Sequence, residues 1–566
     1  MKKIFKYLTT ATFASAMIFT SCETLELELL ENPNALSSDQ ADPALLLNSI
    51  QLDYRTNISV FGGNGSELTR IENFNNRDYF EGLTGGTLNG NWTRTYANII
   101  PNVAAIEALN ANATTPGSLN YQEGVAKALL GHNLMLMVDY IGDVPLSQTN
   151  QPLEFPNPTL DDDAEVYAAA LALLDEASTL IGTNAGTDLY YSNAGQWQRF
   201  INTVRLKAAI TTGDLSTFDS IISGDNFIAA VDDELQWQYG TQEVNPDERH
   251  YNYANDYTPS GANVYQSNWL MNLMNTNDDP RIRYYFVRQS VCTPGASCDP
   301  AGDGESISCS IETPPAHYTT GGFTFCFLED GYWGRDHGDD DGVPPDGLQR
   351  TAHGVYPASG FFDDSDLRFN ADGEPSPRKV GLGLAGAGAG ILPIMLSSEV
   401  KFWQAERAMI DGDTGSAIDF IKEGITLSAE KVYDFASLDA NRLTLDASGN
   451  SIESDAADTV AFANAIEADF NAGSMEDKWN ILAEQYFVSQ FGNGTEAYNF
   501  YRRQGYPTTL QPNIEPSPGT FPRSFPYATG EIIANPNINQ KADNTTQVFW
   551  DTNPPSAPTG GFPASN

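Results

Sequence analysis

The sequence predicts a mainly α protein in which tetratricopeptide-like helix pairs form a scaffold beside an irregular, loop-rich half with few short strands. Two observations support this fold class. Amphipathic, Ala-rich segments recur in two separate parts of the chain, and helices of this kind pack closely in pairs. Between them lies a long stretch, dominated by Gly, Pro, Asp, Asn and aromatic residues, that has no sustained periodicity.

The helical segments lie before and after this stretch. In residues 123–140, apolar and aromatic side chains such as Val125, Leu129 and Leu136 follow one another at helical spacing. The same pattern, with small Ala positions that allow helices to approach closely, continues in residues 163–181, 196–212, 397–413, 414–427, 456–471 and 475–491.

The composition limits the classes of function. The chain has 566 residues, 41% of them hydrophobic, so it can bury a large core. Only 30 Lys and Arg stand against 74 Asp and Glu, which gives a formal net charge of −44. Because nucleic-acid binding needs clustered basic side chains, the composition argues against a nucleic-acid partner.

The N-terminus has the pattern of an export signal. Three lysines precede an apolar stretch at residues 7–20, which is too short for an ordinary membrane span. Residues 19–22 (FTSC) resemble a bacterial lipobox, so we expect cleavage after residue 21 and lipidation of Cys22. The mature chain would then carry a net charge of −47 and would contact the membrane through the lipid anchor only.

Four further cysteines, Cys292, Cys298, Cys309 and Cys326, lie close together in the loop-rich stretch. In an oxidising compartment such a group most simply forms two disulfides, which stabilise a segment with little core of its own. A structural zinc site is the alternative, although the spacing lacks the paired C-x-x-C pattern that zinc sites favour. The sequence leaves the pairing open.

Several long stretches of the chain resemble a single family. They are residues 31–51, 90–106, 136–146, 397–412, 478–512 and 522–540. In this order they resemble the SusD/RagB family of surface nutrient-binding lipoproteins. The resemblance implies helix pairs packed against an irregular half, and a lipid-anchored protein exposed on the outer membrane of a Gram-negative bacterium. It also implies a SusC-like TonB-dependent transporter as partner and an oligomeric nutrient, usually a glycan, as ligand.

We predict one SusD-like unit after the signal at residues 1–21. The unit, residues 22–566, divides into four parts. These are an N-terminal helical part at 22–230, a loop-rich ligand-binding insert with the disulfides at 231–395, C-terminal helical pairs at 396–510 and an irregular tail at 511–566.

A carbohydrate ligand requires an aromatic face for the C–H side of a sugar ring and planar polar groups for its hydroxyls. The insert and an N-terminal loop contain such residues. The candidates are Trp269, Tyr332, Trp333, His337, Asn75, Tyr79 and Tyr257. We favour Trp269, Trp333 and Tyr332, because their turn-rich surroundings have no amphipathic period that would bury them.

Residues 334–347 (GRDHGDDDGVPPDG) concentrate carboxylates around glycine turns. Asp336, Asp339 and Asp341 would offer the hard oxygen ligands that Ca²⁺ takes. The spacing does not match an EF-hand loop, and a solvated turn in an acidic protein is the alternative interpretation. The sequence therefore requires no cofactor, and this segment suggests structural calcium at most.

These features favour a non-catalytic lipoprotein that captures an oligosaccharide or polysaccharide and delivers it to the transporter. No motif marks a catalytic carboxylate pair, a nucleophile elbow or a metalloprotease helix, which argues against an enzyme. Two alternatives stay open: a peptide-capturing lipoprotein of the same transporter type, and a surface glycoside hydrolase. Neutral glycans suit the acidic composition better than polyanionic ones, although salt screens this effect.

Overall fold

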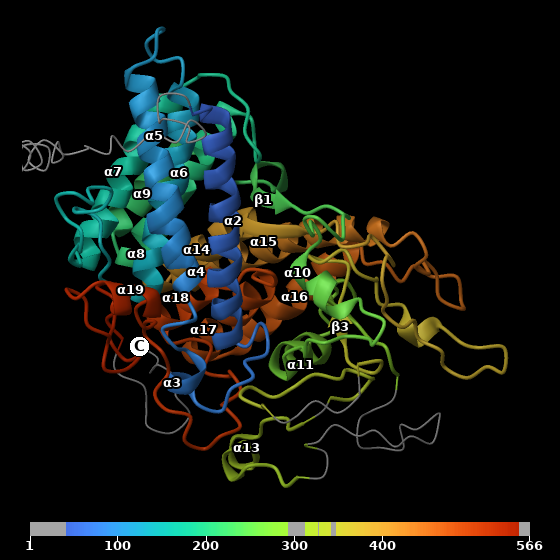
Figure 1. Cartoon of the computed structure of the whole chain (residues 1–566). Coiled ribbons are helices and arrows are strands. Elements are labelled where there is room, and N and C mark those ends of the chain that lie inside the picture. The colour runs from blue at the N-terminus through green and yellow to red at the C-terminus, as the bar shows by residue number, and fades with distance from the viewer. Residues whose placement is uncertain (1–40, 292–308, 310–311, 327, 341–346, 554–566) are drawn as a thin grey trace, which may run out of the picture.

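The computed structural model describes residues 41–291, 309, 312–326, 328–340 and 347–553. Four residues singled out from the sequence, Cys22, Cys292, Cys298 and Asp341, lie outside the described residues. Figure 1 shows an upright bundle of helices from the N-terminal half, a second group from the C-terminal half that crosses it, and a loop-rich region beside and below both.

The upright bundle contains the long N-terminal helices. They are α2 (Pro43–Leu68), α5 (Ile100–Ala111), α6 (Asn120–Ile141), α7 (Asp163–Ile181), α8 (Ala194–Thr212) and α9 (Leu215–Gly224). Helix α6 is buried along almost its whole length. Its Gly131 lets α7 approach, because a Cβ there would lie 3.0 Å from the carbonyl oxygen of Ala170. The helices predicted in this part of the chain are therefore confirmed.

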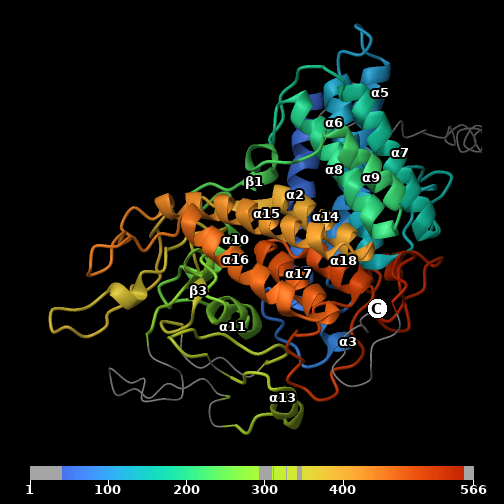
Figure 2. The same cartoon turned by 180° about the vertical axis from the view of Figure 1, so that it is seen from behind.

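The second group contains the C-terminal helices. They are α14 (Ser397–Ile410), α15 (Thr414–Tyr433), α16 (Ala456–Ala472), α17 (Met475–Ser489), α18 (Thr495–Gln504) and α19 (Thr529–Ala534). The side chains of Asp413, Asp455 and Ser474 accept backbone N–H groups at the first turns of α15, α16 and α17. Figure 2 shows α14 and α15 beside α16 and α17, so the predicted helical pairs are present.

A buried polar cluster joins the two groups. Lys207 on α8 forms a fully buried ion pair with Asp139 on α6. The same carboxylate accepts hydrogen bonds from Asn499 Nδ2 on α18 and from Trp550 Nε1 in the C-terminal tail, each at 3.0 Å. One carboxylate thus links four segments that are distant in the sequence.

Strands are few and short. β1 (Leu235–Gln238) pairs antiparallel with β4 (Ile391–Met395), and β2 (Phe286–Val287) pairs antiparallel with β3 (Ala352–His353). The short helices are α3 (Tyr79–Gly82), α4 (Asn89–Thr93), a π-helix (Arg94–Ile99), α10 (Tyr251–Asp256), α11 (Asn268–Thr276), α12 (Ile282–Tyr285) and α13 (Ala316–Gly321). The described part of the chain also has 3-10 helices at Val231–Asp233, Ser365–Leu367 and Asp434–Leu438. The mainly α fold with few short strands is confirmed.

The loop-rich region has small cores of its own. In one of them Tyr253 stacks on Tyr257, with ring centroids 4.2 Å apart. In another, a disulfide between Cys309 and Cys326 packs against Trp333. The disulfide prediction is therefore confirmed for two of the four cysteines.

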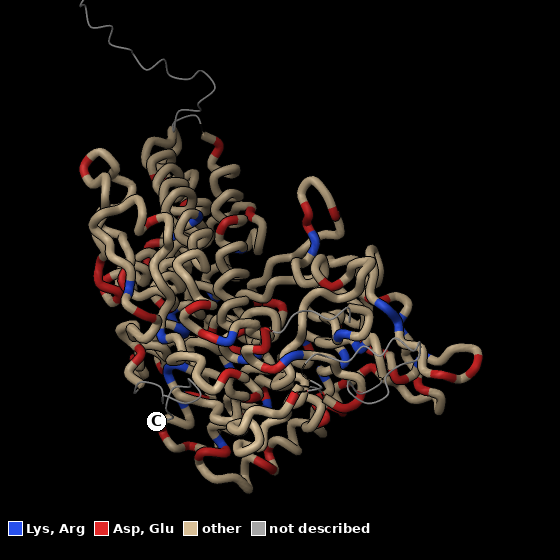
Figure 3. Tube along the Cα trace, turned by 60° about the horizontal axis from the view of Figure 1, so that its bottom comes forward, with Lys and Arg blue, Asp and Glu red and all other residues tan. Residues whose placement is uncertain are grey.

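In the described part of the chain, no helix has both the length and the apolar character needed to cross a membrane. Figure 3 shows Asp and Glu on outer loops around the whole trace, with Lys and Arg scattered among them. The acidic charge is therefore spread over the molecule and is not confined to one face.

Candidate ligand-binding site

The N-terminal loop and the insert meet, although about 260 residues separate them in the sequence. The hydroxyl of Tyr79 lies 2.9 Å from Nε2 of His337, and the ring of Phe74 stacks on the same imidazole at 5.3 Å between centroids. At the rim of this contact Arg77 forms an ion pair with Asp340. The structure thus brings together two regions that the sequence analysis proposed separately for ligand binding.

Tyr79 and His337 are nevertheless buried. Burial, together with the positive charge of Arg70, lowers the pKa of His337 well below its ordinary value, so the imidazole is neutral. Both side chains hold the loop and the insert together and present no free face. Asn75, the other candidate of this loop, is exposed.

Trp333 and Tyr257 are also fully buried. Trp333 belongs to the core around the disulfide, and the hydroxyl of Tyr257 donates to the carbonyl oxygen of His353 at 2.9 Å. The expectation that turn-rich surroundings leave Trp269, Trp333 and Tyr332 exposed is wrong, because all three are buried. Because the loops pack on one another and on a disulfide, they bury aromatic side chains without any amphipathic period.

Trp269 has a different environment, because it lines a hollow of about 170 Å³. The ring is 8% exposed, and its Nε1 donates to the carbonyl oxygen of Thr509 at 3.0 Å. Phe323, which is half-buried, contributes a second aromatic ring to the wall. Polar side chains complete the hollow: Asn272, Thr324, Glu484 and Gln511. The hollow combines aromatic surface with amide, hydroxyl and carboxyl groups.

Glu484 is the titratable group of this hollow. Burial raises its pKa to about 7, although a hydrogen bond from the hydroxyl of Thr509 opposes the shift. Near neutral pH the carboxyl is therefore present in both states, and it can accept or donate a hydrogen bond to a ligand hydroxyl.

Tyr332 lies in the wall of a larger cleft of about 540 Å³. The ring is 3% exposed, and the guanidinium of Arg288 lies 5.1 Å from its centroid. Burial alone would raise the pKa of Asp366, which also lines the cleft. Hydrogen bonds and charge from Arg283, with the charge of Arg288, outweigh burial and lower this pKa to about 2. The cleft therefore offers fixed, planar, ionised groups.

This cleft continues into a neighbouring hollow of about 490 Å³. Asp278, Pro280 and Ser454 line both. Helix α11 contributes Asn275 to the cleft and Asn272 to the hollow of Trp269, so the two candidate surfaces share one helix. Of the predicted ligand residues, Trp269 and Tyr332 thus line cavities, and the structure does not place them in the same one.

Of the three predicted calcium ligands, the two that the structure describes, Asp336 and Asp339, are engaged with protein groups. Asp336 is buried and accepts hydrogen bonds from Asn268 Nδ2 at 3.0 Å and Gln511 Nε2 at 2.7 Å. Burial raises its pKa to about 6 in spite of these bonds. Asp339 forms a buried ion pair with Arg335 at 2.6 Å. These positions give the calcium prediction no support.

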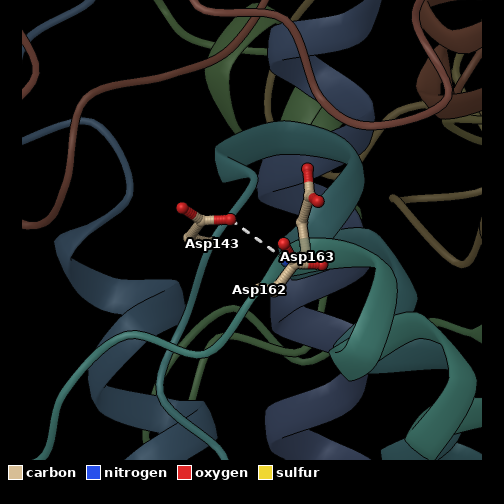
Figure 4. Close-up of side chains that lie close together, drawn as sticks. All are labelled: Asp143, Asp162 and Asp163. Carbon is tan, nitrogen blue, oxygen red and sulfur yellow. Dashed lines mark hydrogen bonds between the residues drawn. The ribbon is translucent and has the colours of Figure 1, made fainter.

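A different group of acids, Asp143, Asp162 and Asp163, has carboxylate oxygens within 4.8 Å of one another (Figure 4). Asp143 accepts the backbone N–H of Asp163 at 3.1 Å, which is the dashed line in the figure, and Asp162 caps α7 through Ala164. Asp163 accepts the backbone N–H of Phe549 at 2.8 Å. The cluster is explained by capping of α7 and attachment of the tail.

Sequence reasoning missed most of the polar wall around Trp269. Glu484 lies on the helix α17, where a surface carboxylate is unremarkable, and Gln511 and Asn272 come from two other segments. These three residues can be recognised as parts of one site only from the folded structure, where they lie close together. One local signal was Gly322, whose positive φ of 72° ends α13 and places Phe323 beside the hollow.

Two family models match most of the chain. Residues 40–308 match a SusD-like model described as starch-binding and associating with the outer membrane, and residues 390–551 match the model of SusD and RagB outer membrane lipoproteins. The chain belongs to the SusD/RagB family. A search of curated proteins finds no significant match.

Solved structures agree with this SusD/RagB fold. A SusD/RagB family protein from Bacteroides thetaiotaomicron is similar with a TM-score of 0.64 and 16% identity, over 90% of this chain and 99% of that chain. A chitin-binding SusD homologue from Flavobacterium johnsoniae has a TM-score of 0.55 and 17% identity, over 90% and 99%. Another structure, described as a chitin-binding protein, has a TM-score of 0.61 and 18% identity, over 90% and 100%.

Proposed function

We propose that this SusD-like protein captures an oligosaccharide or polysaccharide at the cell surface and delivers it to a SusC-like, TonB-dependent transporter. Family membership supports this class of function, because the matched models describe starch-binding and outer-membrane lipoproteins. The two chitin-binding structures of similar fold are consistent with a glycan ligand. In this proposal the lipid on Cys22 is the membrane anchor, and no reaction is catalysed.

The hollow of Trp269 and Phe323 is the observation that carries the proposal. Aromatic surface beside Asn272 and Glu484 matches the two needs of a sugar ring, an apolar C–H face and paired hydroxyls. At about 170 Å³ the hollow suits a single ring of a longer chain. Binding of one sugar would be weak, because few contacts must offset the costs of ordering and desolvation.

Affinity electrophoresis of the mature, lipid-free protein tests the proposal, with starch, a mannan and glycol chitin in separate gels. We expect one neutral glycan to retard the protein, and Trp269→Ala to reduce the affinity about tenfold or more, which corresponds to about 1.4 kcal/mol. Phe369→Ala is the matched control, because Phe369 is an aromatic residue of the same insert that is 59% exposed and lines neither cavity.

Two results would contradict the proposal. If no glycan retards the protein and a peptide digest gives binding heat in calorimetry, the ligand is a peptide. If a glycan binds and Phe369→Ala weakens it as much as Trp269→Ala does, the hollow is not the site. Thermal unfolding of each variant shows whether it is folded.

A further inference from the structure

A separate hollow of about 360 Å³ lies on the helical side of the molecule. Its wall is formed by α4 and the π-helix that follows it, by the loop between α6 and α7, and by α19. In Figure 1, α4 and α19 lie on the left, away from α11 and α13 of the insert. None of its lining residues belongs to the cavities of Trp269 and Tyr332.

Aromatic side chains form the base of this hollow. The rings of Trp92 and Tyr96 lie 4.8 Å apart between centroids, and the half-buried Phe155 from the loop faces the same space. Tyr96 belongs to the π-helix Arg94–Ile99, an arrangement that occurs frequently at functional sites. Its hydroxyl is buried and has no hydrogen-bond partner among the described residues.

Amide side chains at the rim have unused hydrogen-bonding groups. Gln148 accepts the backbone N–H of Thr159 through Oε1 at 3.0 Å, which leaves its NH₂ group unbonded to the described chain. The side chains of Asn150 and Asn157 also make no hydrogen bond within the described part of the chain, and Asn150 is exposed. These amides are planar donors and acceptors of the type that pairs with sugar hydroxyls.

The loop that carries the amides is held in place. Asn535 Nδ2 donates to the carbonyl oxygen of Pro158 at 2.8 Å, and Asn537 Nδ2 donates to that of Asn157 at 2.6 Å. Prolines at 152, 156 and 158 restrict its backbone further. Binding to such a loop costs little ordering entropy, which favours a site that is already formed.

The charge of the hollow selects an uncharged ligand. Among the described residues, no Lys or Arg lines the hollow, and the one carboxylate there, Glu531, already accepts Trp92 Nε1 at 3.2 Å and Asn535 Nδ2 at 2.7 Å. An anionic group would meet no cation there, and a cationic group would meet only a carboxylate that is already hydrogen-bonded. The hollow therefore offers a ligand flat apolar faces and neutral amide groups.

We propose that this hollow is a second carbohydrate site, for the rings of an uncharged oligosaccharide, with Phe155 as the stacking face and Asn150 as a hydroxyl partner. The inference rests on the proposed function only for the class of ligand. A glycan chain would then be held at two places, one on the insert and one on the helical side, and each site can be tested alone.

Fluorine NMR of protein labelled with fluorotryptophan tests the site directly. The chain has eight tryptophans, and Trp92→Phe and Trp269→Phe assign the signals of the two sites. The ligands are uncharged oligomers of glucose, mannose and N-acetylglucosamine, and a proline-rich peptide. We expect one of the oligosaccharides to shift the Trp92 signal. Phe155→Ala should weaken this binding about tenfold, and Asn150→Ala should weaken it severalfold.

Leu153→Ala is the matched control, because Leu153 belongs to the same loop, is fully exposed and does not line the hollow. It should leave the titration of Trp92 unchanged. The inference is overturned if no uncharged oligosaccharide shifts the Trp92 signal, if only the peptide does, or if Phe155→Ala has no effect. The Trp269 signal decides the proposed function separately, since it reports the other hollow.

Discussion

The titration of Glu484 bears on both the stability of the protein and the proposed ligand binding. Burial raises its pKa from 4.5 to about 7, so the folded protein favours the protonated carboxyl. The contribution of Glu484 to stability is therefore fully present below about pH 4.5 and is lost as the pH rises through about 7. We expect Glu484→Gln to remove this loss. As the pH rises from about 4.5 to above 7, the free energy of unfolding of the variant should therefore fall by about 2 to 3 kcal/mol less than that of the wild type.

Urea unfolding at a series of pH values measures this difference. Other carboxyls titrate in the same range, so the result is the difference between variant and wild type and not either curve alone. Glu476→Gln is the matched control, because Glu476 is an exposed carboxylate on the same helix, α17. Parallel curves for Glu484→Gln and the wild type would contradict the raised pKa.

The residues also show where sequence reasoning stops. Among the aromatic residues that the sequence singled out in the insert, Trp269 and Tyr332 line cavities, although both are largely buried. Trp333 and Tyr257 have the same local sequence character, yet both are fully buried and line neither of these cavities. Their burial depends on partners such as Cys309 and His353, which are not sequence neighbours and can be identified only once the loops have folded.

Among the elements, α6, α8 and α18 depend on the buried pair of Lys207 and Asp139. Replacing Lys207 by Met leaves Asp139 buried without its cation, and Glu496 lies close by, 3.4 Å from the ammonium that would be lost. We expect Lys207→Met to destabilise the protein by about 3 to 5 kcal/mol in urea unfolding. The double variant Lys207→Met, Asp139→Leu should recover much of this loss, and a double variant no more stable than Lys207→Met would refute the explanation.

A second prediction at this scale concerns the disulfide of the insert. Cys309 and Cys326 are 17 residues apart, and the bond packs against Trp333. Replacing both cysteines by Ser should destabilise the protein by about 2 to 4 kcal/mol, because the unfolded chain regains the freedom of that loop. Calorimetry measures the change, and an unchanged melting temperature would mean that the insert is held by its other contacts.

Helix boundaries follow closely from periodicity where a helix is amphipathic, as for the segment 163–181, which α7 matches in full. Periodicity did not reveal α2, whose last turns contain Gly62 and Gly65. Those glycines resemble a turn in the sequence. In the fold they admit the start of α18, since a Cβ at Gly65 would lie 2.4 Å from the carbonyl oxygen of Gly494. The glycine is required by a tertiary contact between α2 and α18, so the local sequence does not indicate it.

For the whole molecule, the formal net charge of −44 is the dominant electrostatic feature. Repulsion among so many carboxylates destabilises the compact state at low salt. The Debye length falls from about 30 Å at 0.01 M to about 8 Å at 0.15 M, so added salt screens this repulsion. We therefore expect the melting temperature at pH 7 to rise by several degrees between these concentrations of NaCl.

Scanning calorimetry at both salt concentrations measures the shift, and the same experiment near pH 4.5 is the control. There many exposed carboxylates are protonated, so the repulsion and its dependence on salt should both be smaller. Buried pairs such as Lys207 and Asp139 contribute little to the shift, because salt does not reach them. A melting temperature that is constant or falls with salt at pH 7 would mean that favourable pairs between exposed charges outweigh the net repulsion of this acidic surface.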